Sequence, residues 1–331
     1  MLDLDTLSMT EIIRLQEQLQ QALTRRFQCQ LLLMFTDIVG SSAYFGRFGD
    51  GAGRGLQQLH LDLLSPAVQA ASGRIVDTAG DGAFCAFASA DAAVAAVISL
   101  QQALAEANAQ RSREHQLVLR IGLHWGTVLS DGQDVSGDAV NTCARVASSA
   151  DPGQVRMSRP AVLALTRRQH LCGQALGEVA LKGIQQPMAL VALDWRDAQR
   201  FPRRLQVEET GELLAMPEHD LVCAGRLADR ELPAPNDLVL KHPDAQLTRL
   251  ISRAHFELRR HADGLRLRAL SSQPTLVDGQ AVARGVDVAV RAGSRIGVAG
   301  VLNLRLLAQP LAALGDDADA TMLALSGATA G

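Results

Sequence analysis

The hydrophobic pattern of this 331-residue chain changes near residue 196, and this change constrains the fold more than any single motif. Up to about residue 194, short apolar runs alternate with long helical patterns. From Leu221 to Leu307 the chain has seven short alternating segments, which is typical of a β-sandwich. Residues 196–219 lose clear periodicity and are rich in charge, arginine and proline. We therefore predict two domains joined by a linker over residues 196–219.

The first domain is predicted to be α+β, with a ferredoxin-like split βαβ sheet over residues 30–195. Its elements follow the order β-α-β-β-α-β, which predicts helices on one face of the sheet. The evidence is a buried-strand pattern at Gln30–Thr36, a long helical pattern to about Ala71, a hairpin at 74–87, an apolar helix at 90–107, a strand at 117–125 and a helix at 138–150. The second domain is an all-β sandwich over residues 220–308. The Ala-, Gly- and Asp-rich residues 309–331 are predicted to be a disordered tail.

Residues 1–29 contain a predicted helix that precedes the first strand. Ile12, Leu15, Leu19 and Ala22 repeat at intervals of three and four residues and form one apolar seam. Two interpretations stay open: the helix packs on its own domain, or it forms a short dimerising coiled coil.

The composition excludes several classes of protein. A net charge of −3 argues against a general nucleic-acid binder. The five cysteines form no C-x-x-C pair, which fits reduced thiols in the cytoplasm and gives no zinc site. No basic region leads into an apolar segment at the N-terminus, and the most apolar stretch, Ala83–Leu100, is interrupted by polar residues. We expect a cytoplasmic protein without a signal peptide or a membrane span.

Two aspartates follow or precede predicted strands at small-residue turns. Asp37 lies where the buried strand Gln30–Thr36 ends, and Asp81 lies at the tip of the hairpin. Taken singly, each is most simply a turn former or a helix cap. In a split βαβ sheet, however, the first strand and the hairpin lie side by side. The pair is therefore expected to share hard cations such as Mg²⁺ or Mn²⁺ with triphosphate oxygens.

A third segment places an amide and a guanidinium on one helical face. Asn141 and Arg145 are four residues apart on the helix predicted at 138–150. Together they can orient a sugar and stabilise charge on a phosphoryl group. The plainer interpretation is a solvated helix face.

These segments resemble the class III nucleotide cyclase catalytic domain, the family of adenylyl and guanylyl cyclases. The resemblance runs from about Leu31 to Leu193 and includes the segments Arg120–Gly126 and Leu181–Gly183. It implies attack of the ribose 3′-oxygen on the α-phosphorus, which releases pyrophosphate and a 3′,5′-cyclic nucleotide. It also implies a head-to-tail homodimer with two composite sites, in which the metal-binding pair comes from one subunit and the Asn/Arg pair from the other.

The resemblance assigns roles to individual residues. Asp37, Asp81 and the carbonyl of Ile38 would bind two Mg²⁺ or Mn²⁺ ions. Asn141 would orient the ribose, and Arg145 would stabilise the pentavalent phosphorus. The substrate-binding positions implied for the triphosphate are Arg120 and Lys182, and those implied for the purine are Asp77 and Asp134. The neighbouring His124 is interpreted as a packed strand residue.

The two purine positions do not match either subfamily. Adenylyl cyclases typically have Lys and Asp or Thr there, and guanylyl cyclases typically have Glu and Cys. Asp134 suits the adenine amino group, whereas Asp77 suits guanine N1–H and N2–H. Mispairing a buried polar group costs about 1–3 kcal/mol, although two close carboxylates can share a proton that supplies the missing donor. We favour ATP, because Asp134 is the adenine-type residue; GTP and a catalytically degenerate cyclase are the alternatives.

The second domain resembles the forkhead-associated (FHA) domain, a β-sandwich whose loops bind phosphothreonine peptides. The similar segments are Ala224–Arg226, Ile251–His255 and Ser272–Gly279. A phosphate needs guanidinium and hydroxyl donors at loop tips. The positions implied for phosphopeptide binding are Arg226, Ser252, Arg253 and Thr275, while His255 matches a structural residue. Gln273-Pro274 replaces the usual Asn-Gly, so a sandwich that serves only for docking or dimer support is the plainer alternative.

The leading hypothesis is thus an adenylate cyclase with two divalent metal ions per site and a phosphothreonine-containing protein partner. A signalling scaffold with an inactive cyclase fold is the rival from another class. A third interpretation is another metal-dependent nucleotidyl enzyme on the same sheet, such as a polymerase-like or diguanylate cyclase domain. The spacing of Asn141, Arg145 and Lys182 favours the class III cyclase.

Overall fold

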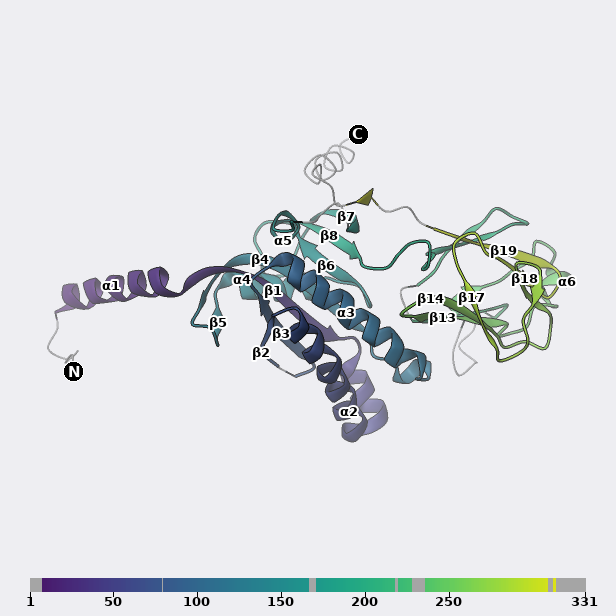
Figure 1. Ribbon diagram of the computed structural model, residues 1–331, viewed down its shortest axis with the longest axis horizontal. Coiled ribbons are helices and arrows are strands. Elements are labelled where there is room, and N and C mark those ends of the chain that lie inside the picture. The colour runs from purple at the N-terminus through teal and green to yellow at the C-terminus, as the bar shows by residue number, and fades with distance from the viewer. Residues whose placement is uncertain are drawn as a thin grey trace.

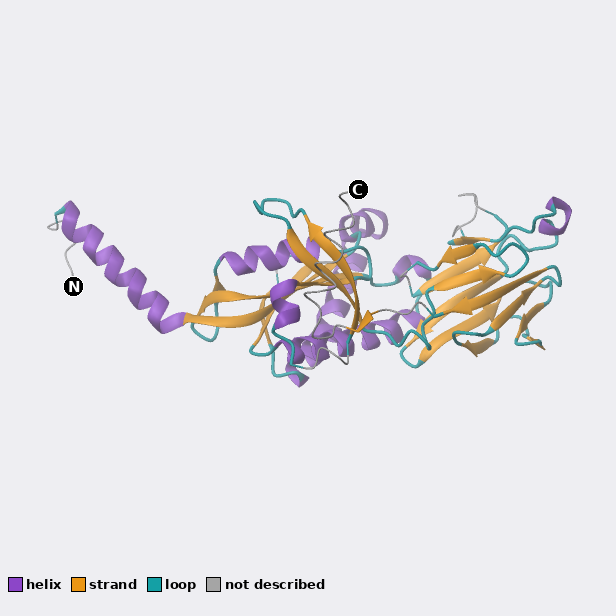
Figure 2. Cartoon of the chain, turned by 90° about the horizontal axis from the view of Figure 1, so that it is seen from above, coloured by secondary structure: helices purple, strands orange, loops and turns teal. Residues whose placement is uncertain are grey.

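The structure is a computed structural model that describes residues 8–78, 80–166, 171–217, 220–227, 236–308 and 312–313. An α+β domain is followed by an all-β domain, and helix α1 lies apart from both (Figures 1 and 2). The helices are α1 (Met9–Phe27), α2 (Ser41–Ala70), α3 (Ala90–Ala109), the 3₁₀ turn η2 (Arg113–His115), α4 (Asp138–Ser148), α5 (Arg159–Leu163) and α6 (Ala245–Thr248).

The sheet of the first domain has the strand order β2-β3-β1-β4-β6-β8-β7-β20, with β5 paired to β4. The observed order β1-α2-β2-β3-α3-β4 confirms the predicted split βαβ arrangement. Its strands are β1 (Gln28–Ile38), β2 (Arg74–Asp77), β3 (Gly82–Phe87), β4 (Leu119–Ser130), β5 (Val135–Ser136), β6 (Val155–Ser158), β7 (Cys172–Val179), β8 (Met188–Asp194) and β20 (Ala312–Ala313).

Alternation along β1 directs two sets of side chains to opposite faces of the sheet. Leu32 and Met34 point into the main core with α2 and α3, which therefore cover one face as predicted. Leu33 and Phe35 belong to a smaller cluster on the opposite face, where they pack against Cys143 of α4. Because Asp37 follows in the same alternation, it shares this second face with α4.

Gly122 allows α4 to approach the sheet closely. A Cβ atom on Gly122 would lie 2.2 Å from the backbone nitrogen of Ala147 on α4, which a real side chain cannot do. The sheet and α4 are therefore in near-backbone contact, and the last turn of α4 lies close to the end of β1.

The all-β domain is a sandwich of two sheets, with strand orders β10-β9-β19-β18-β15-β16 and β12-β11-β13-β14-β17. Alternating apolar side chains such as Leu265 and Leu267 of β14 fill the space between them. The strands are β9 (Arg204–Val207), β10 (Leu213–Ala215), β11 (Leu221–Gly225), β12 (Leu238–Val239), β13 (Phe256–His261), β14 (Gly264–Ala269), β15 (Thr275–Val277), β16 (Gln280–Ala281), β17 (Asp287–Val290), β18 (Arg295–Val298) and β19 (Leu302–Leu307).

The region 196–219, which we expected to be a linker, contributes two strands to this sandwich. Strand β9 pairs with β19, and β10 pairs with β9. Leu205 and Val207 are buried in the sandwich core, so the interpretation of 204–215 as a linker is wrong. Charged neighbours had obscured the alternation of these two residues.

Helix α1 begins with a complete capping box, in which the amide of Ser8 donates to the Glu11 carboxylate at 2.8 Å. None of its residues is buried, and Met9, Ile12, Ile13, Leu19 and Leu23 are exposed. The helix therefore does not pack on its own domain, which was one of the two interpretations of its apolar seam.

The predicted disordered tail, 309–331, lies almost entirely outside the described residues; only Ala312 and Ala313 are described, where they form β20 against β7. Across the described residues, every helix is too short or too polar to cross a membrane.

Candidate functional site

A cavity of about 620 Å³ opens at the end of β1, on the sheet face that α4 covers. Its volume falls in the range of small-molecule sites. The cavity is lined by four of the predicted site residues, Asp37, Asp77, Asp81 and Asp134. Phe35 and Phe84 stack at its base with ring centroids 4.7 Å apart. A polar, acidic rim over an apolar base suits a ligand with an aromatic ring and a charged, cation-bound portion.

The first acidic residue, Asp37, forms an ion pair with Arg120. The two residues lie opposite each other in the antiparallel register of β1 and β4. Both side chains are about one-third exposed, at 32%. Arg120 is absent from the residues that line the cavity. The guanidinium of Arg120 is thus paired with the carboxylate that was predicted to bind metal. The sequence had predicted that Arg120 contacts the triphosphate instead.

The second acidic residue, Asp81, accepts a hydrogen bond from the hydroxyl of Ser41. Ser41 is the first residue of α2, and the preceding Gly40 caps the helix in the left-handed conformation (φ 70°) without a side-chain hydrogen bond. Among the described residues, no side chain caps the N-terminus of α2, which lies beside Asp81. Such a helix end attracts anions.

Divalent cations fit this donor set. Among the described residues, no group of three or more His, Cys, Asp or Glu side chains converges as a ready-made metal site. Asp37 and Asp81 instead offer two carboxylates at one cavity, and oxygen ligands of this kind suit Mg²⁺ or Mn²⁺. Two carboxylates do not complete the coordination of such an ion, so further oxygens would come from substrate phosphates, the Ile38 carbonyl and water.

The predicted purine readers Asp77 and Asp134 lie on two segments held together by Ser130. The hydroxyl of Ser130 accepts from Arg74 of β2 at 2.8 Å and donates to the Asp134 carbonyl at 2.8 Å. It also accepts from the amide of Gly132 at 3.2 Å. Sequence reasoning missed Arg74 and Ser130, because Ser-Asp-Gly reads as an ordinary turn and nothing in it indicates a partner 56 residues away.

The structure does not bring Asn141, Arg145 and Lys182 into this cavity. Asn141 and Arg145 are exposed on α4, while the α4 residues that line the cavity are Val140, Ala144, Ala147 and Ser148. Lys182 is exposed in the turn after β7. One chain therefore presents the acidic half of the predicted site and the amide–guanidinium half on different surfaces.

Two buried histidines lie close to the site. His60 of α2 is 2% exposed, and its Nε2 lies 3.0 Å from the hydroxyl of Thr36. Burial lowers its pKa to about 4, against the smaller opposing effect of Asp81. His124, 8% exposed, lies 2.8 Å from the hydroxyl of Ser158, and burial lowers its pKa to about 4 as well. Both rings are neutral near pH 7, which suits a packing role.

In the second domain, the predicted phosphate-binding residues come from two adjacent loops. The amide of Arg226 donates to the carbonyl of Ser252 at 3.1 Å. The loops are this close because residue 225 is glycine; a Cβ there would lie 2.1 Å from the Arg253 carbonyl oxygen. Among the described residues, the Nε atom of Arg226 is buried and has no hydrogen-bond partner, whereas Arg253 on the neighbouring loop is exposed. An arginine on each of two adjacent loops suits an anionic ligand.

The predicted contact from Thr275 takes a different form. Thr275 is 2% exposed, and its hydroxyl lies 3.2 Å from Nε2 of His255. The Ser252 amide donates to Nδ1 of His255 at 3.3 Å, so Nε2 carries the proton and donates to Thr275. Burial also lowers the pKa of His255. Thr275 therefore supports the Ser252 loop through His255, because its buried hydroxyl cannot meet a peptide directly.

A mixed sheet with paired aspartates at the end of its first strand, followed by a β-sandwich, defines the class of protein. Residues 25–194, just over half of the chain, match the family described as the adenylate and guanylate cyclase catalytic domain. The chain belongs to this family. Residues 222–299 match the FHA domain, so both resemblances found in the sequence are confirmed.

Individual relatives share only part of this architecture. The chain is 30% identical over 185 residues to the protein named "Putative adenylate cyclase 3" of Rhizobium meliloti, which covers 56% of this chain and 32% of that protein. It is 27% identical over 183 residues to an adenylate cyclase of Lachancea kluyveri, covering 46% of this chain and 10% of that protein. The chain thus spans about a third or less of the length of the curated relatives it matches.

Among solved structures, an adenylate/guanylate cyclase/hydrolase from Silicibacter pomeroyi is similar. It has 27% sequence identity and a TM-score of 0.45, covering 50% of this chain and 96% of the other.

Proposed function

We propose that this chain is an adenylate cyclase that converts ATP to 3′,5′-cyclic AMP and pyrophosphate at composite sites of a head-to-tail homodimer. One observation carries the proposal: Asp37 and Asp81 line a nucleotide-sized cavity, whereas Asn141 and Arg145 of the same chain lie exposed outside it. A second copy that places its α4 face against the cavity would complete the set of predicted groups. The relatives named as adenylate cyclases support the family and leave the nucleotide to experiment.

In this proposal each residue acts on a defined part of the nucleotide. Asp37 and Asp81 would hold two divalent cations, Mg²⁺ or Mn²⁺, which polarise the reacting oxygens when bound. From the partner subunit, the equivalents of Asn141 and Arg145 would orient the ribose and stabilise the charge that develops on the phosphoryl oxygens.

The triphosphate would lie near the open N-terminus of α2, whose free amides favour anions. Lys182 would approach it from the turn after β7. Arg120 can reach the phosphates only after it leaves Asp37, and a cation bound at Asp37 would favour that release by competing for the carboxylate.

ATP is favoured because Asp134 can accept from the adenine amino group. Asp77 is the second reader at the same cavity, and its own Oδ1 already accepts from the Thr78 amide at 2.7 Å. A guanylate cyclase, and a scaffold with a degenerate site, are the alternatives that the Asp77 position leaves open.

The FHA domain would bind a phosphothreonine-containing protein partner through the loops of Arg226 and Ser252. The close approach of these two loops at Gly225, with the exposed Arg253 next to Ser252, supports this assignment.

The test is incubation of purified protein with ATP or GTP, each with Mg²⁺ or Mn²⁺, followed by quantification of the cyclic products. We expect cyclic AMP as the main product and none from Asp37→Ala. Mixing the inactive Asp81→Ala and Arg145→Ala chains should restore part of the activity, because one of the two composite sites in a heterodimer is intact. Retained activity in Asp37→Ala, or no recovery from a mixture shown to form heterodimers, would reject the site as drawn.

A further inference from the structure

The segment Arg113–Val118, called here the 113–118 segment, lies between the FHA domain and the loop that carries the predicted metal ligands. It connects α3 to β4 and contains the turn η2. It contacts the all-β domain at one end and the start of α2 at the other.

Arg113 binds the FHA domain directly. Its guanidinium forms an ion pair with Asp237 at 2.5 Å, and the Asp237 side chain is only 9% exposed. The second oxygen of Asp237 accepts from the amide of Cys223 in β11 at 2.8 Å. Asp237 is therefore fixed by its own domain, and it holds Arg113 at a defined position.

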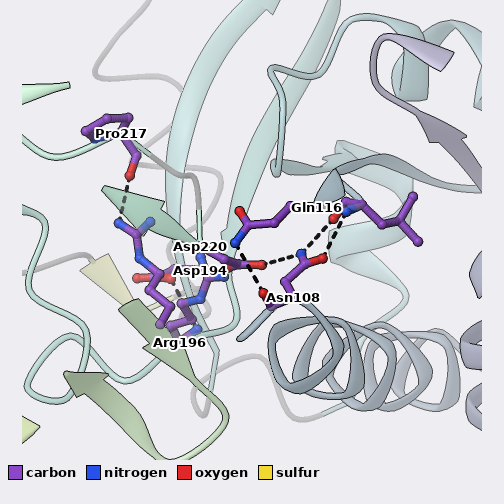
Figure 3. Close-up of polar contacts among 8 residues, drawn as sticks. Asn108, Gln116, Asp194, Arg196, Pro217 and Asp220 are labelled. Atoms are coloured by element: carbon purple, nitrogen blue, oxygen red, sulfur yellow. Dashed lines mark hydrogen bonds and ion pairs between the residues drawn. The ribbon is translucent and has the colours of Figure 1, made fainter. Parts of the chain in front are cut away.

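Asn108 makes a second, buried connection (Figure 3). This residue is 0% exposed at the end of α3. Its side-chain amide donates to the Leu117 carbonyl and to the Asp220 carboxylate, both at 2.8 Å, and its oxygen accepts from the Leu117 amide at 2.9 Å. Asp220 leads into β11 of the FHA domain and also pairs with Arg196 at 3.0 Å. One buried amide thus joins the 113–118 segment to the second domain.

The opposite end of the segment contacts the loop after β1, residues 37–40, which is called here the metal-binding loop because it carries the predicted ligands Asp37 and Ile38. The amide of Val39, two residues after Asp37, donates to the Val118 carbonyl at 2.9 Å. Nδ1 of His115 lies 2.8 Å from the Tyr44 hydroxyl, and Glu114 pairs with Arg47 at 2.6 Å. Both partners lie in the first two turns of α2.

Helix α2 in turn reaches the second aspartate, because its first residue, Ser41, donates to Asp81. The segment therefore contacts the backbone next to Asp37 and the helix whose first residue holds Asp81.

On the FHA side, the neighbour of Asp237 connects the two recognition loops. The side-chain amide of Asn236 donates to the Leu227 carbonyl at 2.9 Å and to the Arg253 carbonyl at 2.6 Å. Leu227 follows Arg226, and Arg253 follows Ser252. Asn236 thus contacts both recognition loops, those of Arg226 and Ser252, and the adjacent Asp237 contacts the cyclase domain through Arg113.

We propose that the 113–118 segment couples the FHA recognition loops to the metal-binding loop, with Arg113 and Asn108 as positioning residues for the cyclase reaction. The inference rests on the proposed function, because it assumes that Asp37 and Asp81 bind the reacting cations. A ligand that moves the loops of Arg226 and Arg253 displaces Asn236, and with it Asp237. Arg113 follows through the ion pair, and the contacts of His115 and Val118 carry the change to Tyr44 and Val39.

The experiment compares Asp237→Asn with the wild-type chain. Asparagine keeps an oxygen for the Cys223 amide but removes the charge that holds Arg113. We expect the Mn²⁺ concentration for half-maximal activity to rise by about fivefold or more. The KM for the nucleotide at saturating Mn²⁺ should change by less than roughly twofold. Arg113→Gln, on the other side of the interface, should likewise raise the Mn²⁺ requirement and leave the KM for the nucleotide nearly unchanged. Arg111→Ala is the matched control, because Arg111 lies just after α3 and donates to the Ala107 carbonyl in the last turn of that helix.

A measurement that does not depend on turnover separates this inference from the proposed function. Hydrogen exchange over residues 38–44 reports the Val39 amide and the first turn of α2. We expect faster exchange there in Asp237→Asn and Arg113→Gln, and wild-type exchange in Arg111→Ala. Unchanged exchange and an unchanged Mn²⁺ requirement in both interface variants would overturn the coupling. Loss of the proposed function would appear instead as an inactive wild-type chain, with the exchange result still deciding the coupling.

Discussion

The guanidinium of Arg120 forms an ion pair with the carboxylate of Asp37 across the paired strands β4 and β1. This pair places a fixed positive charge where the proposed function needs a divalent cation. Because both side chains are about one-third exposed, the pair is screened by water, and its strength is modest. A metal ion arriving with a nucleotide therefore competes against about 1 kcal/mol or less.

Removing this competitor should strengthen metal binding to the free chain. We expect Arg120→Ala to lower the dissociation constant for Mn²⁺, measured by titration calorimetry without nucleotide, by roughly twofold to fivefold. Arg156→Ala is the matched control, because Arg156 also pairs with an aspartate, Asp151, and neither residue lines the cavity. Unchanged or weaker Mn²⁺ binding in Arg120→Ala would show that the arginine does not compete at Asp37.

Asp77 should influence the choice of nucleotide. Replacing it with lysine supplies a donor for adenine N1, so Asp77→Lys is expected to raise the ratio of kcat/KM for ATP to that for GTP by about tenfold, the equivalent of one well-formed hydrogen bond. The measurement is initial rate against concentration for both nucleotides. An unaltered ratio would mean that Asp77 does not contact the purine.

Ser130 should control how well the nucleotide is bound. Ser130→Ala removes the hydroxyl that joins Arg74 to the Asp134 carbonyl and accepts from the Gly132 amide, so three hydrogen bonds are lost. We expect KM for the preferred nucleotide to rise roughly threefold to tenfold, with kcat little changed. Ser65→Ala is the control, because the Ser65 hydroxyl accepts from an exposed glutamine one turn along α2, away from the cavity. An equal loss of kcat would place Ser130 in the chemical step instead.

Stability should fall in acid because of two buried histidines. Burial holds the pKa of His60 and of His124 at about 4, compared with 6.5 ordinarily. The unfolded chain therefore binds more protons than the folded chain between these values, so the free energy of unfolding falls as pH drops from about 6.5 to about 4 and is constant above. Each histidine contributes up to about 3 kcal/mol across this window.

Urea unfolding at pH 7.5, 5.5 and 4.5 measures this dependence. His60→Gln keeps a donor for the Thr36 hydroxyl and cannot take up a proton, so it should flatten the curve between pH 6.5 and 4. A curve as steep as that of the wild type would show that His60 is not the titrating group.

Arg226 should dominate peptide binding by the FHA domain. We expect Arg226→Ala to weaken binding of a pool of phosphothreonine peptides by roughly 10-fold to 100-fold, because a charge-assisted hydrogen bond from the guanidinium to the phosphate is lost. Fluorescence anisotropy with phosphorylated and unphosphorylated pools measures this loss. Arg249→Ala, at the end of the short helix α6, should bind as the wild type does. Equal binding of both pools by the wild type would leave the sandwich with a docking role only.

The parts of the fold that local pattern controls were predictable from the sequence. The apolar run of β1 and the Asp-Gly hairpin tip located Asp37 and Asp81, because each aspartate is fixed by the element beside it. Strands β9 and β10 were missed, since their few buried residues are surrounded by charge and become a strand only through pairing with β19. The contact between Asp220 and Asn108 spans 112 residues and depends on how the two domains meet, so no local pattern indicates it. The role of Ser130 was missed for the same reason, because its partner Arg74 is 56 residues away in the sequence.

The exposure of Asn141 and Arg145 outside the acidic cavity has a consequence for the amount of protein that a cell makes. If catalysis needs two chains, then below the dissociation constant of the pair the rate of product formation rises with the square of the protein concentration. At such concentrations, a twofold increase in protein would increase the rate of product formation fourfold. Dilution of the protein as cells grow would therefore lower the rate of product formation faster than it lowers the protein concentration.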